Sequence, residues 1–264
     1  MKIFAIILTF VVSLAYLNVE AAEVVAPSNS ELKEAQNELD NSIQNLEDVK
    51  EKKELTPEEK DRLELEASKK VLAEVIQFSI AETSNIIDKL GQLTDLKEKY
   101  AESREGYLII LEDLFKFQED YLLKLEDEAL DLAGVKKLAV AFKKWRFDIY
   151  GPALRDAINF LLVLQGNEVL AVAEKRHSKI SGDLKILKNS KIIKVELLHP
   201  ILNETRLILD DASLLNVRAN QLLFDASSTP AQLSGATESV LVKVKQVYAK
   251  FLEMSALVKK MLGK

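Results

Sequence analysis

The chain has 264 residues, a formal net charge of −6, no cysteine and only two histidines. The lack of cysteine excludes a disulfide framework, and with so few histidines the usual pairs of nucleophile and general base have almost no candidates. Eight glycines and five prolines amid abundant Leu, Lys, Glu and Ala exclude a sheet protein with frequent turns and predict an all-α fold.

The start of the chain has the features of a secretory signal peptide. Lys2 precedes an apolar run over residues 3–17, and Val19 and Ala21 place small residues where a signal peptidase reads. We therefore predict a signal peptide over residues 1–21 and an exported, periplasmic or extracellular protein. An uncleaved anchor is the less favoured alternative, because about 20 apolar residues are needed to span a bilayer.

A short linker over residues 22–30 is predicted to follow. Its last residue, Ser30, can cap a helix that begins at Glu31. From Leu32 to Val49, apolar residues recur at spacings of three and four residues, which predicts a helix with one narrow buried face.

The second predicted helix has the clearest start in the chain. Thr56, Pro57 and Glu59 form the pattern of a capping box with proline at the first helical position. The apolar face that follows extends to Tyr100, with Gly91 as its only weak point. We therefore predict one helix of more than forty residues.

The middle of the chain continues this helical pattern. It restarts over residues 107–125, weakens at residues 133–134 and resumes over 135–150. This shorter segment is predicted to end at Gly151 and Pro152, and a long helix is predicted from Ala153 to about Leu187.

Two further helices are predicted after a polar turn at residues 188–191. The first covers about 195–226, although residues 191–197 alternate and a strand is the alternative there. The second follows a capping box of Thr229, Pro230 and Gln232.

These elements predict an elongated antiparallel bundle of about five to seven long helices with coiled-coil-like packing. Long helices joined by short turns favour antiparallel neighbours. We assign residues 31–264 to this bundle domain, with a subdivision near residue 133 or 151 as an option.

Charge is distributed unevenly along the chain. Residues 23–66 have six cations and fourteen anions, whereas residues 174–264 have fifteen cations and nine anions. We expect the acidic first helix to lie along the basic C-terminal helices, so that the charges cancel within one bundle. The alternative is head-to-tail attraction between molecules, which salt would weaken.

Both histidines follow a glutamate by three residues, as Glu174 and His177, and as Glu196 and His199. Paired Glu-x-x-His elements hold the metals of di-iron carboxylate bundles. An antiparallel hairpin would place the two histidines at different depths, and His199 precedes a proline. We therefore predict no metal site, and the di-metal carboxylate bundle is kept as an alternative function.

Residues 136–150 interleave aromatic and cationic side chains. Such a mixture suits a membrane interface, a phosphate-bearing polymer or a glycan. The favoured interpretation is a bundle corner, in which the aromatic rings pack inward while the lysines extend to solvent.

The sequence thus predicts an exported, non-enzymatic bundle with an interaction, scaffold or envelope-associated role and no cofactor. Its expected partner is a protein bound through helical faces, with self-association as an option and nucleic acid excluded. Membrane contact is not favoured. The alternative is a lipid-handling or membrane-active bundle that uses the apolar stretch over residues 158–173.

Overall fold

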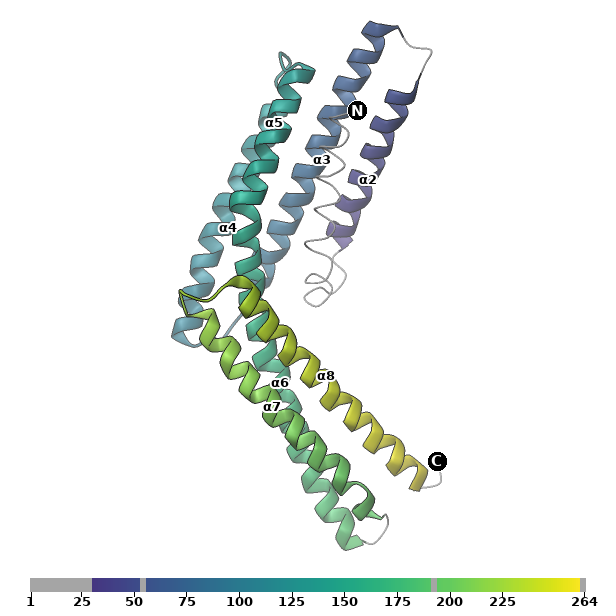
Figure 1. The fold of residues 1–264 in the computed structure, drawn as a ribbon, viewed down its shortest axis with the longest axis vertical. Helices are drawn as coiled ribbons and strands as arrows, with labels where there is room; N and C mark the ends of the chain where they lie inside the picture. Colours follow the sequence, from purple (N-terminus) through teal and green to yellow (C-terminus); the bar gives the residue numbers. More distant parts are fainter. Residues whose placement is uncertain (1–29, 53–55, 191–193, 262–264) are drawn as a thin grey trace. The chain divides into compact units, whose positions relative to one another are not determined.

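The computed structural model of the chain describes residues 30–52, 56–190 and 194–261. No strand occurs in these ranges, which confirms the all-α prediction. The predicted signal peptide and all of the linker except Ser30 lie outside them. The helices, shown in Figure 1, are α2 (Ser30–Glu51), α3 (Pro57–Gly91), α4 (Glu98–Leu125), α5 (Leu132–Trp145), the π-helix η1 (Arg146–Tyr150), α6 (Gly151–Ser190), the 3₁₀ turn η2 (Val195–Leu197), α7 (His199–Leu223) and α8 (Pro230–Met261).

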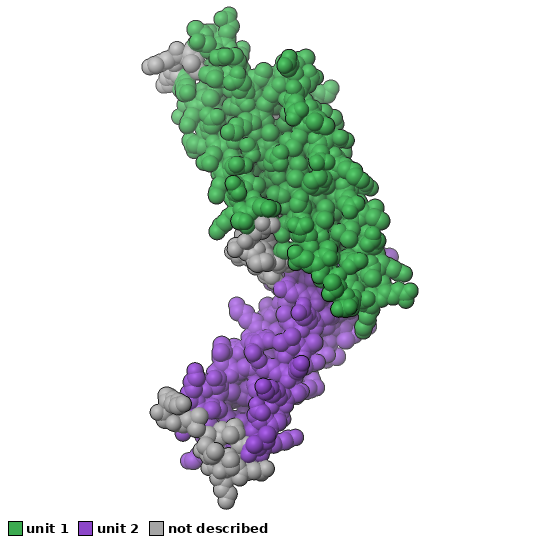
Figure 2. Space-filling view, turned by 180° about the vertical axis from the view of Figure 1, so that it is seen from behind, with its two compact units in different colours: residues 1–158 green, residues 159–264 purple. Residues whose placement is uncertain are grey.

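The chain divides into two compact units, residues 1–158 and residues 159–264 (Figure 2). The subdivisions considered at residues 133 and 151 both fall within the first unit. Helix α6 contributes its first residues to the first unit and the remainder to the second.

In the first unit, α3 is the helix that the others contact. Helix α2 packs along it, and α4 and α5 contact it as well. Lys69 donates to the carbonyl of Asp127, and Thr83 meets Gln118. Lys69 near the start of α3 contacts Asp127, and Thr83 further along α3 contacts Gln118. The two helices α3 and α4 are therefore antiparallel, as predicted.

The start of α3 confirms the predicted capping box. The amide of Glu59 donates to Oγ1 of Thr56, and Oε2 of Glu59 accepts from the amide of Thr56 at 3.0 Å. These reciprocal bonds satisfy backbone groups that the first turn of a helix leaves without partners.

The end of α3 differs from the prediction, because the helix stops at Gly91 and α4 begins only at Glu98. Between them Asp95 has a φ of 54°, in the left-handed region that aspartate tolerates better than most residues. The guanidinium of Arg104 donates to the carbonyl of Leu93 at 2.8 Å. The turn is therefore held by specific contacts, and one continuous helix to Tyr100 was a wrong prediction.

The second unit is an antiparallel three-helix arrangement of α6, α7 and α8. Asn167 contacts Asn220, and His177 contacts the carbonyl of Leu202, so α6 and α7 run in opposite directions. Ion pairs from Lys243 to Asp211 and from Lys250 to Glu204 show the same for α7 and α8. The core of the unit joins all three helices and η2, through residues such as Leu170, Leu209, Val247 and Phe251.

Helices α5, η1 and α6 follow one another without interruption, which contradicts the predicted stop at Gly151 and Pro152. A proline inside an α-helix clashes with the carbonyl four residues earlier. Here the amide of Gly151 donates to the carbonyl of Arg146, five residues earlier. We infer that this wider turn relieves the clash at Pro152 and lets the helix continue.

Candidate functional site: a buried polar cluster

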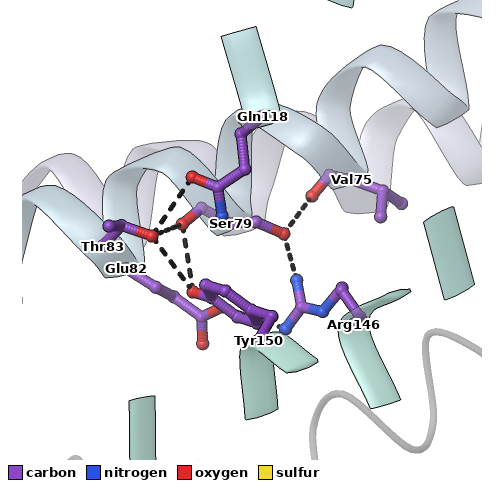
Figure 3. A network of polar contacts seen from close by, with 7 residues as sticks. All are labelled: Val75, Ser79, Glu82, Thr83, Gln118, Arg146 and Tyr150. Atoms are coloured by element: carbon purple, nitrogen blue, oxygen red, sulfur yellow. Dashed lines mark hydrogen bonds and ion pairs between the residues drawn. The ribbon is translucent and has the colours of Figure 1, made fainter. Parts of the chain in front are cut away.

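The most concentrated polar chemistry of the described residues lies inside the first unit. Three side chains come from α3, one from α4 and two from η1, and each is less than 9% exposed. We call them the buried polar cluster (Figure 3): Ser79, Glu82, Thr83, Gln118, Arg146 and Tyr150.

The local helical geometry explains why these residues meet. Ser79, Glu82 and Thr83 are three and four positions apart and therefore share one face of α3. Arg146 and Tyr150 are four apart in a π-helix, whose turns are wider than those of an α-helix. Both side chains are consequently directed at the same face of α3.

An ion pair forms the charged part of the cluster. Nη2 of Arg146 lies 3.0 Å from Oε2 of Glu82, and both side chains are only 8% exposed. The other terminal nitrogen, Nη1, donates to Oγ of Ser79, and the guanidinium carbon lies 4.8 Å from the centre of the Tyr150 ring. Buried charges are tolerated when they are paired and hydrogen-bonded in this way.

Tyr150 adds a neutral donor. Its hydroxyl lies 3.2 Å from Oε2 of Glu82 and 3.1 Å from the carbonyl of Ser79. Burial, and then the nearby charge of Glu82, raise the pKa of Tyr150 well above its usual value. The phenol therefore keeps its proton at physiological pH and donates it within the cluster.

Thr83 and Gln118 complete the cluster on the side of α4. Figure 3 shows Gln118 reaching Thr83 from one side and Tyr150 from the other. Oγ1 of Thr83 donates to the carbonyl of Ser79 at 2.8 Å and lies 3.2 Å from Oε1 of Gln118. Nε2 of Gln118 is buried without a protein partner. With Nε2 and Oε1 exchanged, the amide could donate to Thr83, at the cost of leaving Oε1 unpaired.

Aromatic rings pack beside the cluster. Trp145 stacks on Phe117 at 4.3 Å between ring centres and lies 5.4 Å from both Phe142 and Tyr150. These rings point inward, as the bundle-corner interpretation predicts. Phe147 differs, because its side chain is 77% exposed, and Arg146 is buried rather than extended to solvent.

The two Glu-x-x-His elements are not part of this cluster. His177 is buried in α6, where its Nε2 lies 3.2 Å from the carbonyl of Leu202. Glu174 is half-buried on the same helix, whereas Glu196 and His199 are exposed at η2 and the start of α7. Within the described ranges, no group of three or more His, Asp or Glu side chains is placed to hold a metal ion.

The polar groups of the cluster contact one another. Its carboxylate is neutralised by Arg146, its phenol is held in the protonated form, and every member is buried. A general base or nucleophile needs a free lone pair within reach of a substrate. The arrangement instead fixes η1 against α3 and α4.

Sequence analysis did not identify this cluster, although the pattern contained a signal. The apolar face of α3 includes Val71, Val75, Ile86 and Leu90, all buried, but polar residues stand at the intervening core positions. Polar residues on a buried helix face need partners from a neighbouring helix. The polar residues at the core positions between Val75 and Ile86 therefore indicated that α3 has buried polar contacts there.

Comparisons with protein families, with curated proteins and with solved structures give no match to this chain.

Proposed function

We propose that this protein is an exported, non-enzymatic helical bundle that recognises a protein partner through exposed helical faces. Its role is that of an interaction, scaffold or envelope-associated protein, and it acts without a cofactor. The closed nature of the buried polar cluster supports the non-enzymatic part of the proposal, because its reactive groups satisfy one another.

An exposed face of α8 carries the proposal. Val242 and Leu252 are 48% and 72% exposed, and the alanines between and beyond them on this face are exposed as well. Spacings of three and four along this face match the a and d positions of a coiled-coil seam. We call it the α8 stripe, and its six residues are Val242, Lys245, Ala249, Leu252, Ala256 and Lys259.

The α8 stripe is distinct from the face that α8 buries in its own unit. Val240, Val244, Val247, Phe251 and Met254 belong to the core of the second unit. Helix α8 therefore has one apolar face that is covered and a second one that is exposed. Exposed apolar faces rimmed by charge are typical of surfaces that bind a partner.

A membrane-active role receives weaker support. Among the described residues one helical stretch, Leu132–Ile186, is long and apolar enough to cross a membrane by length and composition, and half of its most apolar window is buried in protein. Val163, Leu170 and Ala173, from the apolar stretch that suggested lipid handling, are packed into the clusters of the second unit. These side chains already have protein neighbours.

A photo-crosslinking residue at position 252 in the native host tests the proposal. The control places the same residue at position 119, where Glu119 is exposed on α4. We expect discrete protein adducts from position 252 and none from position 119. Absence of adducts at position 252, or equal labelling at both positions, would contradict recognition through the α8 stripe.

A further inference from the structure

The two compact units carry opposite charge. Residues 1–158 contain 21 Lys and Arg and 32 Asp and Glu, whereas residues 159–264 contain 15 and 10. The acidic helix α2 packs along α3, whose first turn contains Glu58 and Glu59. The expected cancellation of acidic against basic helices is therefore not found within either unit.

The exposed side of α2 is acidic along its whole length. The helix has seven acidic and two basic residues, and its buried face is limited to Leu39, Ser42, Leu46 and Val49. Glu34 and Asp48 are exposed, and neither has a Lys or Arg nitrogen within 4.0 Å in the described part of the chain. These two carboxylates of α2 thus have no cationic partner among the described residues of their own unit.

Like charges meet where α2 packs on α3. Burial, and then the charge of Glu38 on α2, raise the pKa of Glu74 on α3, and the nearby Lys70 offsets part of this effect. A cationic surface placed against α2 would relieve this repulsion.

The α8 stripe has two lysines whose separation equals that of Glu34 and Asp48 on α2. Lys245 and Lys259 are exposed and have no carboxylate within 4.0 Å among the described residues. They are two heptads apart, or about 21 Å along a helix. Glu34 and Asp48 are also two heptads apart, so two helices laid side by side can form both pairs in either orientation. Lys243 and Lys250 on the same helix differ, since they are already paired within the second unit.

We propose that the α8 stripe of one molecule docks along the acidic face of α2 of a second copy, forming a head-to-tail contact. The inference rests on the proposed function, because it names the partner of the same α8 stripe. A contact between two different surfaces leaves one α2 and one α8 free at the two ends of an open assembly, so further copies can add. Association then increases with concentration beyond a dimer.

Sedimentation velocity of the purified chain tests the contact. We expect the mean mass to rise with protein concentration in about 0.01 M salt and to return to the monomer in about 1 M salt, where the Debye length falls from about 30 Å to about 3 Å. A monomer at low salt, or association that persists at high salt, would overturn the proposal. A change of shape without a change of mass would also overturn it, because the contact would then lie within one chain.

Charge-reversal variants locate the surfaces. The pair Glu34→Lys and Asp48→Lys on α2, and the pair Lys245→Glu and Lys259→Glu on α8, should each abolish association at low salt. An equal mixture of the two variants should restore it, because the new lysines of one face the new glutamates of the other. Failure of the mixture to associate would overturn the assignment of the two surfaces.

A matched control is available on α4, where Glu112 and Glu119 are exposed. The pair Glu112→Lys and Glu119→Lys makes the same change in net charge as the α2 pair and should leave association intact. Circular dichroism should show the same helix content in all variants. Loss of association in the α4 control would attribute the effect to net charge alone and overturn the proposal, whereas the adducts at position 252 test the proposed function separately.

Discussion

Arg146 and Glu82 face each other inside the first unit, with 3.0 Å between Nη2 and Oε2 and only 8% of each side chain exposed. The pair joins the π-helix η1 to α3. Removing one partner of a buried ion pair leaves the other charge without compensation, whereas replacing both with apolar groups is often tolerated.

The Glu82→Gln variant is therefore expected to lower the free energy of unfolding by about 3–5 kcal/mol. The double variant Glu82→Leu and Arg146→Met should recover most of this loss. Trp145, the only tryptophan of the chain, lies beside the cluster, so its fluorescence during urea unfolding reports on this unit. A single variant as stable as the parent would contradict a structural role for the pair.

Substitution at Gly151 tests the π-helix. Alanine normally stabilises a helix interior by about 1 kcal/mol relative to glycine. At Gly151, however, a Cβ would lie 3.1 Å from the carbonyl oxygen of Arg146. Gly151→Ala is thus expected to destabilise the unit in the same fluorescence assay.

Gly106→Ala is the matched control for that substitution. Gly106 lies within α4 of the same unit, and a Cβ there would meet nothing within 4 Å. It should show the ordinary gain of up to about 1 kcal/mol. Equal stabilisation by both substitutions would mean that the close approach to Arg146 does not matter.

The raised pKa of Tyr150 predicts a dependence of stability on alkaline pH. The folded chain holds the phenolic proton more tightly than the unfolded chain, whose tyrosine titrates near pH 10. The stability from this proton is complete below about pH 10 and is lost as the pH rises above it, by up to about 1.4 kcal/mol per pH unit.

Tyr150→Phe removes this titration. The variant should be less stable than the parent at pH 7, because Glu82 and the carbonyl of Ser79 lose the one hydroxyl proton that lies between them. The difference between the two chains should shrink above about pH 10, as measured by urea unfolding across the pH range. A difference that stays constant with pH would contradict a buried, protonated phenol.

Liposome flotation separates protein recognition from membrane insertion. We expect no flotation of the purified chain with anionic vesicles in about 1 M salt, since electrostatic adsorption is screened there and apolar insertion is not. The exposed Phe147 is the side chain to test next if flotation persists. Persistent flotation that Phe147→Ser abolishes would favour the membrane-active alternative.

The sequence predicted the fold better than it predicted the candidate site. Thr56 and Thr229 start their helices as the capping patterns indicate, because cap bonds involve residues only three apart. The turn after Gly91 contains a hydrogen bond from Arg104 to the carbonyl of Leu93, eleven positions earlier, and the continuation through Pro152 depends on the π-helix. Rules based on a few neighbouring residues, such as capping patterns or the position of a proline, do not take these two features into account.

The candidate site was missed for the same reason. Ser79 and Glu82 have a buried hydrogen-bond partner because Arg146, more than sixty positions later in the chain, packs against them. Periodicity identifies which face of α3 is buried, but the pairing of polar residues on that face depends on which helix packs against it.

Carbodiimide coupling of lysines to carboxylates, applied to an equal mixture of normal and heavy-isotope chains, tests the central claim most directly. The α8 stripe should yield coupled peptides that join Lys245 or Lys259 to Glu34 or Asp48, with normal and heavy isotopes combined in one product. Coupled peptides between α2 and α8 that never combine isotopes, or none that include the α8 stripe, would contradict recognition of a second copy through this face.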